Sequence, residues 1–175
     1  MKREESALLV PVPDAERAVG EWRSLYDPSA SAGVPAHVTL LYPFVPRTDI
    51  DAALVKELHG HFAATRAFPF KLRRVGRFPG ILYLEPDPDH PFRKLTEALL
   101  RRYPDFPPYG GVYEEVIPHL TVIDRSRERP DVALLRRAEA DVLPHLPVAT
   151  RADRVWLMVQ RRRRWQLHTS FVLDG

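Results

Sequence analysis

The chain has 175 residues, of which 45% are hydrophobic and 28% are charged, a balance that supports one compact domain with a buried core. It contains no cysteine, which excludes thiolate nucleophiles, disulfide bonds and cysteine-based zinc sites. The net charge is only +3, and arginine far outweighs lysine among the basic residues. Guanidinium groups suit phosphate, but a GC-rich coding sequence produces the same enrichment, so composition alone selects no ligand.

The first ten residues combine charges at positions 2–5 with a short apolar stretch that ends at Pro11. This segment is too short and too acidic for a secretory signal peptide. No apolar run elsewhere approaches the roughly 20 residues that span a bilayer. We therefore expect a cytoplasmic protein that does not associate with membranes.

Short strands and amphipathic helices alternate along the first half of the chain. We expect Asp14 to cap the first helix and a Thr48-x-x-Asp51 capping box to open the second. Residues 29–33 should form a loop, and Pro79-Gly80 should join two strands in a hairpin. The predicted elements are a strand at 7–13, a helix at 15–26, a strand at 34–44, a helix at 50–62 and strands at 68–78 and 81–85.

The second half follows the same order and closes with another hairpin, whose tip is the arginine run 161–164. Because the strands of a hairpin are antiparallel, the pattern predicts an α+β fold rather than a βαβ series. Without a linker or low-complexity segment, residues 1–175 should form one domain of two interleaved lobes. The predicted elements are a helix capped by Asp89 that ends near 103, a strand at 116–124, a helix at 130–143 and strands at 154–160 and 165–173.

One short phrase occurs twice, as His37-Val38-Thr39-Leu40 and as His119-Leu120-Thr121-Val122. In a strand, residues i and i+2 share a face, so each copy offers an imidazole and a hydroxyl opposite two core-facing apolar residues. A single strand histidine is more often a packing residue than a catalytic one. Two copies at corresponding positions of two half-chains instead favour a shared ligand site between the lobes.

Two facing imidazoles can divide acid–base work, because one ring can be neutral and accept a proton while the other is charged and donates one. Opposite protonation states suit in-line displacement at phosphorus. The two threonine hydroxyls and the imidazole N–H groups can hold the non-bridging oxygens. Nothing in this chemistry requires a metal or a cofactor.

These motifs resemble those of the two-histidine (2H) phosphoesterase superfamily, and the longer phrases 37–44 and 107–111 resemble its bacterial 2′–5′ RNA ligase-like branch. The resemblance implies a bilobal fold of two antiparallel-rich sheets with pseudo-twofold symmetry around a central cleft, with helices outside. It implies metal-independent hydrolysis of 2′,3′-cyclic phosphates or related 2′–5′ or cyclic phosphodiesters. It also implies that His37, Thr39, His119 and Thr121 are catalytic. We prefer His119 as the base and His37 as the acid, and the symmetry leaves the reverse assignment open.

Four further residues are candidates for contacting the substrate, namely Tyr42, Tyr109, Tyr113 and Arg125. Tyr42 continues the first motif strand, and the two other tyrosines flank Gly110-Gly111, where an aromatic ring could stack on a base. Ligase-like members often carry a basic residue just after the second motif, whereas this chain has Ile123-Asp124 before Arg125. The run 161–164 can be a solvated hairpin tip or a track for an RNA backbone.

The remaining histidines have simpler explanations. His168 should be a structural or surface residue of the last strand, and His59 and His61 do not share a helix face that could chelate a metal. The expected partner is RNA or a small cyclic nucleotide as substrate, with the protein a monomer and no obligate protein partner. The alternatives are a non-catalytic RNA-binding module on the same fold, an RNA 2′–5′ ligase and a metal-dependent hydrolase.

Overall fold

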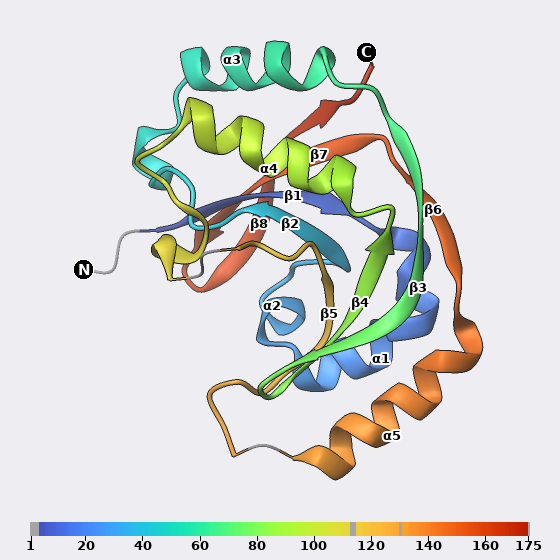
Figure 1. Ribbon diagram of the computed structural model, residues 1–175. Coiled ribbons are helices and arrows are strands. Elements are labelled where there is room, and N and C mark those ends of the chain that lie inside the picture. Colours follow the sequence, from blue (N-terminus) through green and yellow to red (C-terminus); the bar gives the residue numbers. More distant parts are fainter. Residues whose placement is uncertain (1–3, 113–114, 130, 175) are drawn as a thin grey trace.

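The structure is a computed structural model that describes residues 4–112, 115–129 and 131–174. Two four-stranded antiparallel sheets form its centre, and helices lie on the outside (Figure 1). The sequence therefore predicted the α+β fold class correctly. The elements are β1 (Ser6–Pro11), α1 (Glu16–Tyr26), α2 (Pro28–Ser31), β2 (His37–Leu41), α3 (Ala52–Ala63), β3 (Phe68–Phe78), β4 (Ile81–Asp87), α4 (His90–Arg102), β5 (Leu120–Asp124), α5 (Val132–Val142), β6 (Val148–Ala152), β7 (Arg154–Arg161) and β8 (Arg164–Val172), with short 3-10 turns η1 (Pro13–Ala15), η2 (Arg47–Asp49), η3 (Pro108–Gly111) and η4 (Leu143–His145).

The two sheets have the same plan. Their strand orders are β2-β1-β7-β8 and β5-β4-β3-β6, so each motif strand is an edge strand beside the strand that precedes it in the sequence. A helical connection joins the two strands in each case, through α1 and α2 in one lobe and α4 in the other. This correspondence is the expected pseudo-twofold symmetry, and it puts both motifs at sheet edges.

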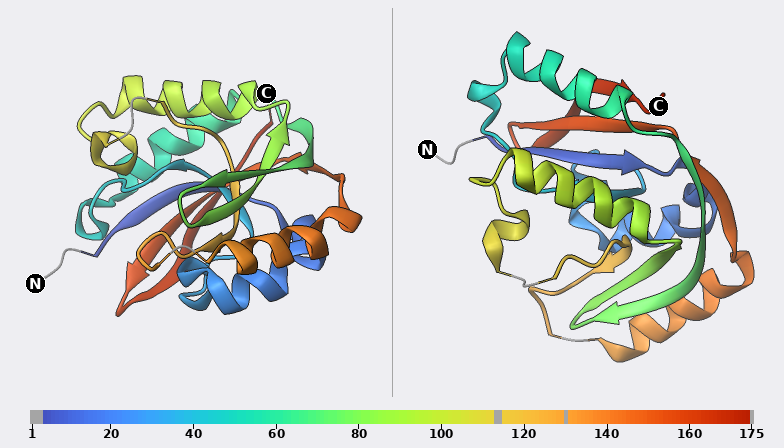
Figure 2. Two further views of the ribbon diagram at one scale, coloured as in Figure 1. Left: turned by 60° about the horizontal axis from the view of Figure 1, so that its bottom comes forward. Right: turned by 45° about the horizontal axis from the view of Figure 1, so that its top comes forward.

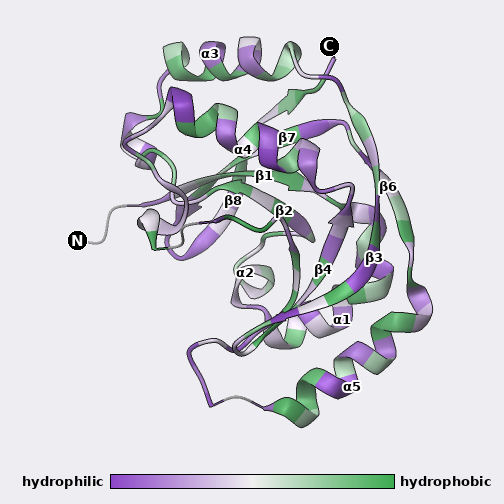
Figure 3. Ribbon diagram, in the orientation of Figure 1, coloured by the Kyte–Doolittle hydropathy of each residue, from purple (hydrophilic) through white to green (hydrophobic). Residues whose placement is uncertain are grey.

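Helices cover the two sheets from opposite sides. Figure 2 shows α3 and α4 on one side and α1 and α5 on the other. Thr96 of α4 donates a hydrogen bond of 3.0 Å to the Leu40 carbonyl of β2, and Phe62 of α3 packs 5.3 Å from Phe171 of β8. The helices carry alternating hydrophilic and hydrophobic bands in Figure 3, as helices with one buried face should. No helix in the described part of the chain is long and apolar enough to cross a membrane.

Burial follows the alternation predicted for the motif strands. Val38 and Leu40 are 0% and 1% exposed, and Leu120 and Val122 are both fully buried. His37, Thr39, His119 and Thr121 each keep part of their surface accessible to solvent. Each motif therefore presents its polar residues on the face opposite the core, as the period of two requires.

Several boundaries differ from those expected from the sequence. The motif strands are shorter, 37–41 and 120–124, because Pro35, Pro43 and Pro118 flank them and cannot donate to a ladder. The expected loop at 29–33 contains the short helix α2, and the arginine tip narrows to two residues because Arg161 and Arg164 pair across the hairpin. The strand β6, which pairs with β3, was missed.

Of the three predicted helix caps, two are wrong and the third is confirmed in position only. Asp14 lies within a 3-10 turn and accepts a hydrogen bond of 2.6 Å from Thr150, so it caps no helix. Asp51, not Thr48, is the N-cap of α3 and accepts from the Leu54 amide at 2.8 Å. Asp89 occupies the N-cap position of α4 but makes no capping hydrogen bond with its side chain.

The predicted hairpin at Pro79-Gly80 is confirmed, and it brings β3 and β4 against the segment after β5. Gly80 has φ +74°, and a Cβ at this position would lie 2.9 Å from the Arg125 carbonyl oxygen. The Arg125 amide donates a hydrogen bond of 2.9 Å to the Gly80 carbonyl. Only glycine permits this contact, which fixes the chain just beyond the second motif.

Candidate active site

His37 and His119 have the same local setting. The Nδ1 atom of His37 lies 2.7 Å from the Pro35 carbonyl oxygen, and that of His119 lies 2.7 Å from the Ile117 carbonyl oxygen. A carbonyl only accepts hydrogen bonds, so each Nδ1 carries the proton of the neutral ring. Nε2 is then the nitrogen through which each ring can exchange a proton with a ligand.

The two motif strands meet at the junction between the sheets. Residues of β2 and β5 have Cα atoms within 8 Å of each other. The His119 ring also lowers the pKa of His37 through its charge, so the two imidazoles are within electrostatic reach. Two edge strands from different sheets thus bring both histidine and threonine pairs to one place.

Aromatic side chains support His119. The rings of Phe78 and Tyr83 lie 5.3 and 5.4 Å from its imidazole, in edge-on contacts, and stack on each other at 4.3 Å. Tyr83 pairs with Thr121 across the β4–β5 ladder and with Gly76 across the β3–β4 ladder. A Cβ on Gly76 would lie 2.3 Å from the Tyr83 ring, so glycine makes room for this aromatic support. The sequence analysis missed these residues, although a glycine inside a predicted strand signals such a close approach.

A buried ion pair supports His37. Arg23 of α1 is 2% exposed, and its guanidinium donates to the Asp27 carboxylate at 3.0 and 3.1 Å. It also donates to the Val34 carbonyl at 3.2 Å, while Glu16 accepts from the Ala36 amide at 2.6 Å. Helix α1 therefore holds the backbone that leads into His37. The only sequence signal was the i,i+4 spacing of Arg23 and Asp27.

The environments separate the two imidazoles electrostatically. Burial lowers the pKa of His37 to about 4, an effect that the Pro35 carbonyl and Asp27 oppose and that the Arg23 cation strengthens. Burial also lowers the pKa of His119, where the Ile117 carbonyl and the Asp124 carboxylate oppose it. The neutral form is favoured in both rings. Of the two rings, His37 is the one whose pKa burial lowers to about 4, so a proton shared by the pair is favoured on His119.

The predicted substrate-contacting residues lie in different places. Tyr42 is five residues beyond His37, about 16 Å along an extended chain. Its hydroxyl donates to Glu5 at 2.6 Å and its ring lies 5.9 Å from that of Trp165, and burial, with Glu5, raises its pKa to about 12. The Tyr109 amide donates to the Tyr42 carbonyl at 2.6 Å, so these two residues meet. Tyr113 lies outside the described residues.

Arg125 lies just beyond β5, and its Nε donates to Glu128 at 2.9 Å. Of the other histidines, His168 is exposed on β8 and His59 packs edge-on against Phe171 at 4.7 Å. The His61 Nε2 atom is buried without a partner, and burial lowers the pKa of that ring. In the described part of the chain, no three histidine or carboxylate side chains are grouped to hold a metal ion.

Two antiparallel sheets with one His-x-Thr motif at the facing edge of each define the two-histidine phosphoesterase class of fold. Residues 10–164 match the family model of the 2′-5′ RNA ligase superfamily, and the chain belongs to this superfamily. The resemblance inferred from the two motifs is thereby confirmed.

Curated relatives match over almost the whole chain. A protein of Geobacillus thermodenitrificans, whose name assigns it provisionally to the phosphoesterases, is 26% identical over 96% of this chain and 95% of its own length. A similarly named protein of Geobacillus kaustophilus is 27% identical over 88% of this chain and 87% of its own length.

Solved structures share the fold. TT0787 of Thermus thermophilus superposes with a TM-score of 0.65 at 19% identity, with 98% of each chain covered. Escherichia coli LigT in complex with NADP+ gives a TM-score of 0.59 at 16% identity, with 100% of each chain covered. At such identities the similarity establishes the architecture alone.

Proposed function

We propose that this protein is a metal-independent phosphodiesterase that opens 2′,3′-cyclic phosphates or related 2′–5′ or cyclic phosphodiester bonds at RNA ends or in nucleotides. One observation carries the proposal. Two imidazoles from facing edge strands have the same Nδ1–H···O=C contact, which leaves both Nε2 atoms for proton transfer. Such a pair suits in-line substitution at phosphorus, where one group must lose a proton as another gains one.

In the proposed reaction, one imidazole takes a proton from water as the water oxygen attacks phosphorus. The bond from phosphorus to a ribose oxygen breaks on the opposite side, and the second imidazole gives its proton to that oxygen. The product is a phosphomonoester, and the two rings have exchanged protonation states. Thr39 and Thr121, which share strand faces with the histidines, donate hydrogen bonds to the non-bridging oxygens, where negative charge develops.

The charges around the rings favour one division of labour. The sequence left the two assignments open, with His119 preferred as the base. Burial lowers the pKa of His37 to about 4, with Arg23 adding to this effect and Asp27 opposing it, and so favours the neutral ring that a base needs; at His119 the Asp124 carboxylate opposes the effect of burial. We therefore propose His37 as the base and His119 as the acid.

A nucleotide as ligand has support from structural neighbours. Solved structures of Escherichia coli LigT contain 3′-AMP, ATP and NADP+. The RNA-binding module and the RNA 2′–5′ ligase remain alternative functions for the same fold: the first predicts binding without turnover and the second predicts joined RNA ends.

The test is product analysis on 2′,3′-cyclic nucleotides and 2′–5′-linked dinucleotides in excess EDTA. We expect hydrolysis, which His37→Ala and His119→Ala should each reduce by about 10²–10⁴-fold, the usual worth of a positioned acid or base. His168→Ala is the matched control, since His168 is an exposed strand histidine remote from the motifs in the sequence.

Each other outcome supports an alternative. Salt-sensitive RNA binding without turnover, unaffected by either motif variant, would support the binding module. Joining of RNA ends would support the ligase. Activity lost in EDTA and restored by zinc or manganese would support a metal-dependent hydrolase.

A further inference from the structure

A hollow of about 630 Å³ lies at the end of β5, the strand that follows His119, and we call it the Arg163 hollow. Three segments form it: the end of α1 with α2, the chain just after β5, and the tip of the β7–β8 hairpin. These segments are far apart in the sequence and meet only in the fold. Its lining includes Tyr26, Asp27, Asp124, Arg125, Arg163 and Arg164.

Two acidic residues of the lining connect the hollow to the two histidines. Asp27 accepts from Arg23, whose guanidinium also donates to the Val34 carbonyl at 3.2 Å just before β2, and Asp124 is the last residue of β5. One carboxylate is thus linked to each motif segment, and each opposes through its charge the burial that lowers the pKa of the nearby histidine. A substrate whose phosphorus lies between the histidines could extend from there into the hollow.

The carboxylates of the hollow already have partners. Asp27 binds Arg23, Glu128 binds Arg125, and Asp124 accepts from the amide and hydroxyl of Ser126 at 3.0 and 2.7 Å. These contacts satisfy the acidic groups of the lining without using Arg163 or Arg164.

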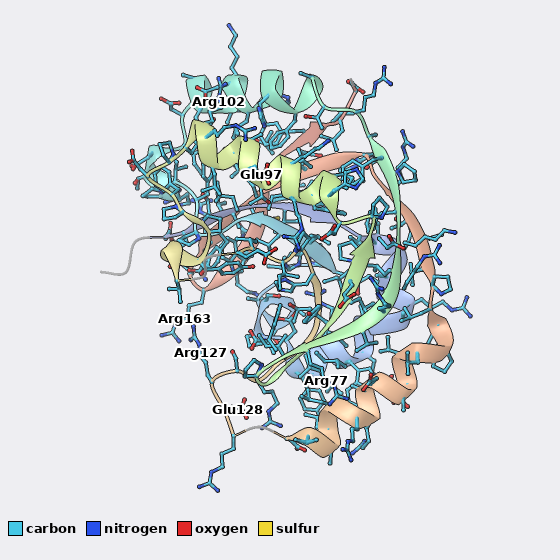
Figure 4. All side chains as sticks on the ribbon, viewed as in Figure 1. Arg77, Glu97, Arg102, Arg127, Glu128 and Arg163 are labelled. Carbon is cyan, nitrogen blue, oxygen red and sulfur yellow. The ribbon has the colours of Figure 1, made fainter. Side chains whose placement is uncertain are left out.

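By contrast, no carboxylate in the described part of the chain pairs with Arg163, Arg164 or Arg127. Arg164 donates only to the Ser31 carbonyl, at 3.0 Å. Among the described residues, Arg163 and Arg127 make no hydrogen bond or ion pair with their side chains. Figure 4 shows these two arginines at the same edge of the molecule. The lining therefore contains a guanidinium, that of Arg163, with no acidic partner in the described part of the chain.

The hairpin tip holds its arginines in an unfavourable backbone conformation. Arg162 and Arg163 are the two central residues of the turn, with φ +47° and +67°. Such turns normally use Asn-Gly, because a Cβ disfavours the left-handed region. Non-glycine residues held there often mark functional sites.

The tip is also fixed to its surroundings. The Trp165 amide donates to the Ala32 carbonyl at 2.8 Å, and the Arg164 side chain donates to the Ser31 carbonyl at 3.0 Å. A Cβ on Gly33 would lie 3.1 Å from the Trp165 carbonyl oxygen, so glycine permits this close docking. The backbone that carries the arginines is therefore held in place before any ligand binds.

We propose that the Arg163 hollow binds a second phosphate group of the substrate, remote from the phosphorus between the histidines. This inference rests on the proposed function and specifies its substrate class. A guanidinium without a partner, on a fixed backbone, suits a phosphate oxygen. Substrates with a second phosphate include oligonucleotides that end in a 2′,3′-cyclic phosphate and ADP-ribose 1″,2″-cyclic phosphate. A 2′,3′-cyclic mononucleotide has none.

The test variant is Arg162→Asn combined with Arg163→Gly, which removes both guanidinium groups but supplies the residues that the turn prefers. The thermal midpoint should not fall, so lost affinity cannot be ascribed to misfolding. The control variant is Arg136→Ala combined with Arg137→Ala, which removes the same charge from the exposed surface of α5.

The first measurement is kcat/KM for each of the three substrates. The wild type should prefer a substrate with a second phosphate, and the tip variant should reduce that preference by about tenfold, the worth of a charge-assisted hydrogen bond. The control should keep it. The two substrates with a second phosphate distinguish an RNA end from a dinucleotide. Equal preference in both variants, or no preference in the wild type, would overturn the inference.

The second measurement does not depend on turnover. Fluorescence anisotropy gives the affinity for a labelled pentanucleotide with a 3′-phosphate at several salt concentrations. The tip variant should bind more weakly than the control. In a plot of log affinity against log salt concentration, its slope should be shallower than that of the control by about one. Weaker binding with no hydrolysis by any form would reject the hydrolase but retain the phosphate site. Hydrolysis with identical binding by both variants would reject the site alone.

Discussion

The two lobes present the same motif in the same backbone contact but support it by different means. His37 depends on helix α1, whose buried Arg23–Asp27 pair holds the chain that enters β2. His119 depends on the aromatic pair Phe78 and Tyr83, for which Gly76 makes room. The symmetry therefore extends to the motif residues but not to the residues behind them.

This difference explains how a symmetric pair can perform asymmetric chemistry. Both rings make the same backbone contact, but burial lowers the pKa of His37 to about 4, whereas at His119 the Asp124 carboxylate opposes the lowering by burial. Acid–base catalysis in one step needs such a separation. The following changes disturb one lobe at a time and are ordered by expected effect.

The largest effect is expected from Arg23→Met, which leaves the 3%-exposed Asp27 without its cation. Breaking a buried ion pair on one side costs about 3–5 kcal/mol of unfolding free energy. The pKa of His37 should also rise, because a cation is lost and Asp27 remains. Urea denaturation and NMR titration of the ring would measure both effects.

The control for this change is Arg154→Met, which removes an arginine from an exposed pair with Asp153. It should cost less than about 1 kcal/mol. Equal effects of the two variants would mean that the buried pair contributes nothing special to the His37 lobe.

Acid should destabilise the protein through His37, an effect of order 3 kcal/mol. The unfolded ring binds a proton below about pH 6.5, whereas the folded ring does so only below about pH 4. Between these values the unfolded state binds more protons, so the free energy of unfolding falls as the pH drops. Denaturation at several pH values should show a shallower fall for His37→Gln. An unchanged fall would contradict the lowered pKa, and His168→Gln provides the control.

Gly76→Ala should disturb the His119 lobe, because the added Cβ would meet the Tyr83 ring at 2.3 Å. Such overpacking costs about 1–3 kcal/mol, and the displaced ring should reduce kcat more than it raises KM. Gly60→Ala in α3 is the control, since nothing lies within 4 Å of its added Cβ. That change should stabilise the helix by about 0.5–1 kcal/mol.

The smallest effects are expected from the threonines. Thr39→Val and Thr121→Val each remove one donor to the phosphoryl oxygens and should lower kcat by about tenfold while the fold is retained. Comparable losses of kcat in the two variants would mean that the two hydroxyls contribute equally. Full activity in both variants would contradict the role given to the two threonines. Steady-state kinetics measures the activity, and circular dichroism checks that the fold is retained.

The sequence predicted the fold class and the motif strands because both depend on local patterns. Alternation along 37–40 and 119–122 determines which side chains face the core, and this holds in any sheet. The repeat then indicated that two half-chains share one plan. Strand order did not follow from these patterns, since pairing across a sheet depends on distant segments.

The missed features all depend on contacts between distant residues. Strand β6 is a short edge strand with weak alternation, recognisable only from its pairing with β3. Asp14 reads as a helix cap, but its partner Thr150 is remote in the sequence. Arg23 and Asp27 have the spacing of an ordinary surface pair, and only the packing of α1 buries them.

The matching carbonyl contacts of the two imidazoles have a consequence for the direction of the reaction. By microscopic reversibility, the ring that protonates a departing ribose oxygen also deprotonates that oxygen when it attacks. In the proposed mechanism, each half-cycle leaves the pair in the mirror-image proton arrangement, ready for the opposite displacement. The histidines therefore serve bond breaking and bond making alike, and the nucleophile bound beside the basic ring, water or a ribose hydroxyl, determines the product.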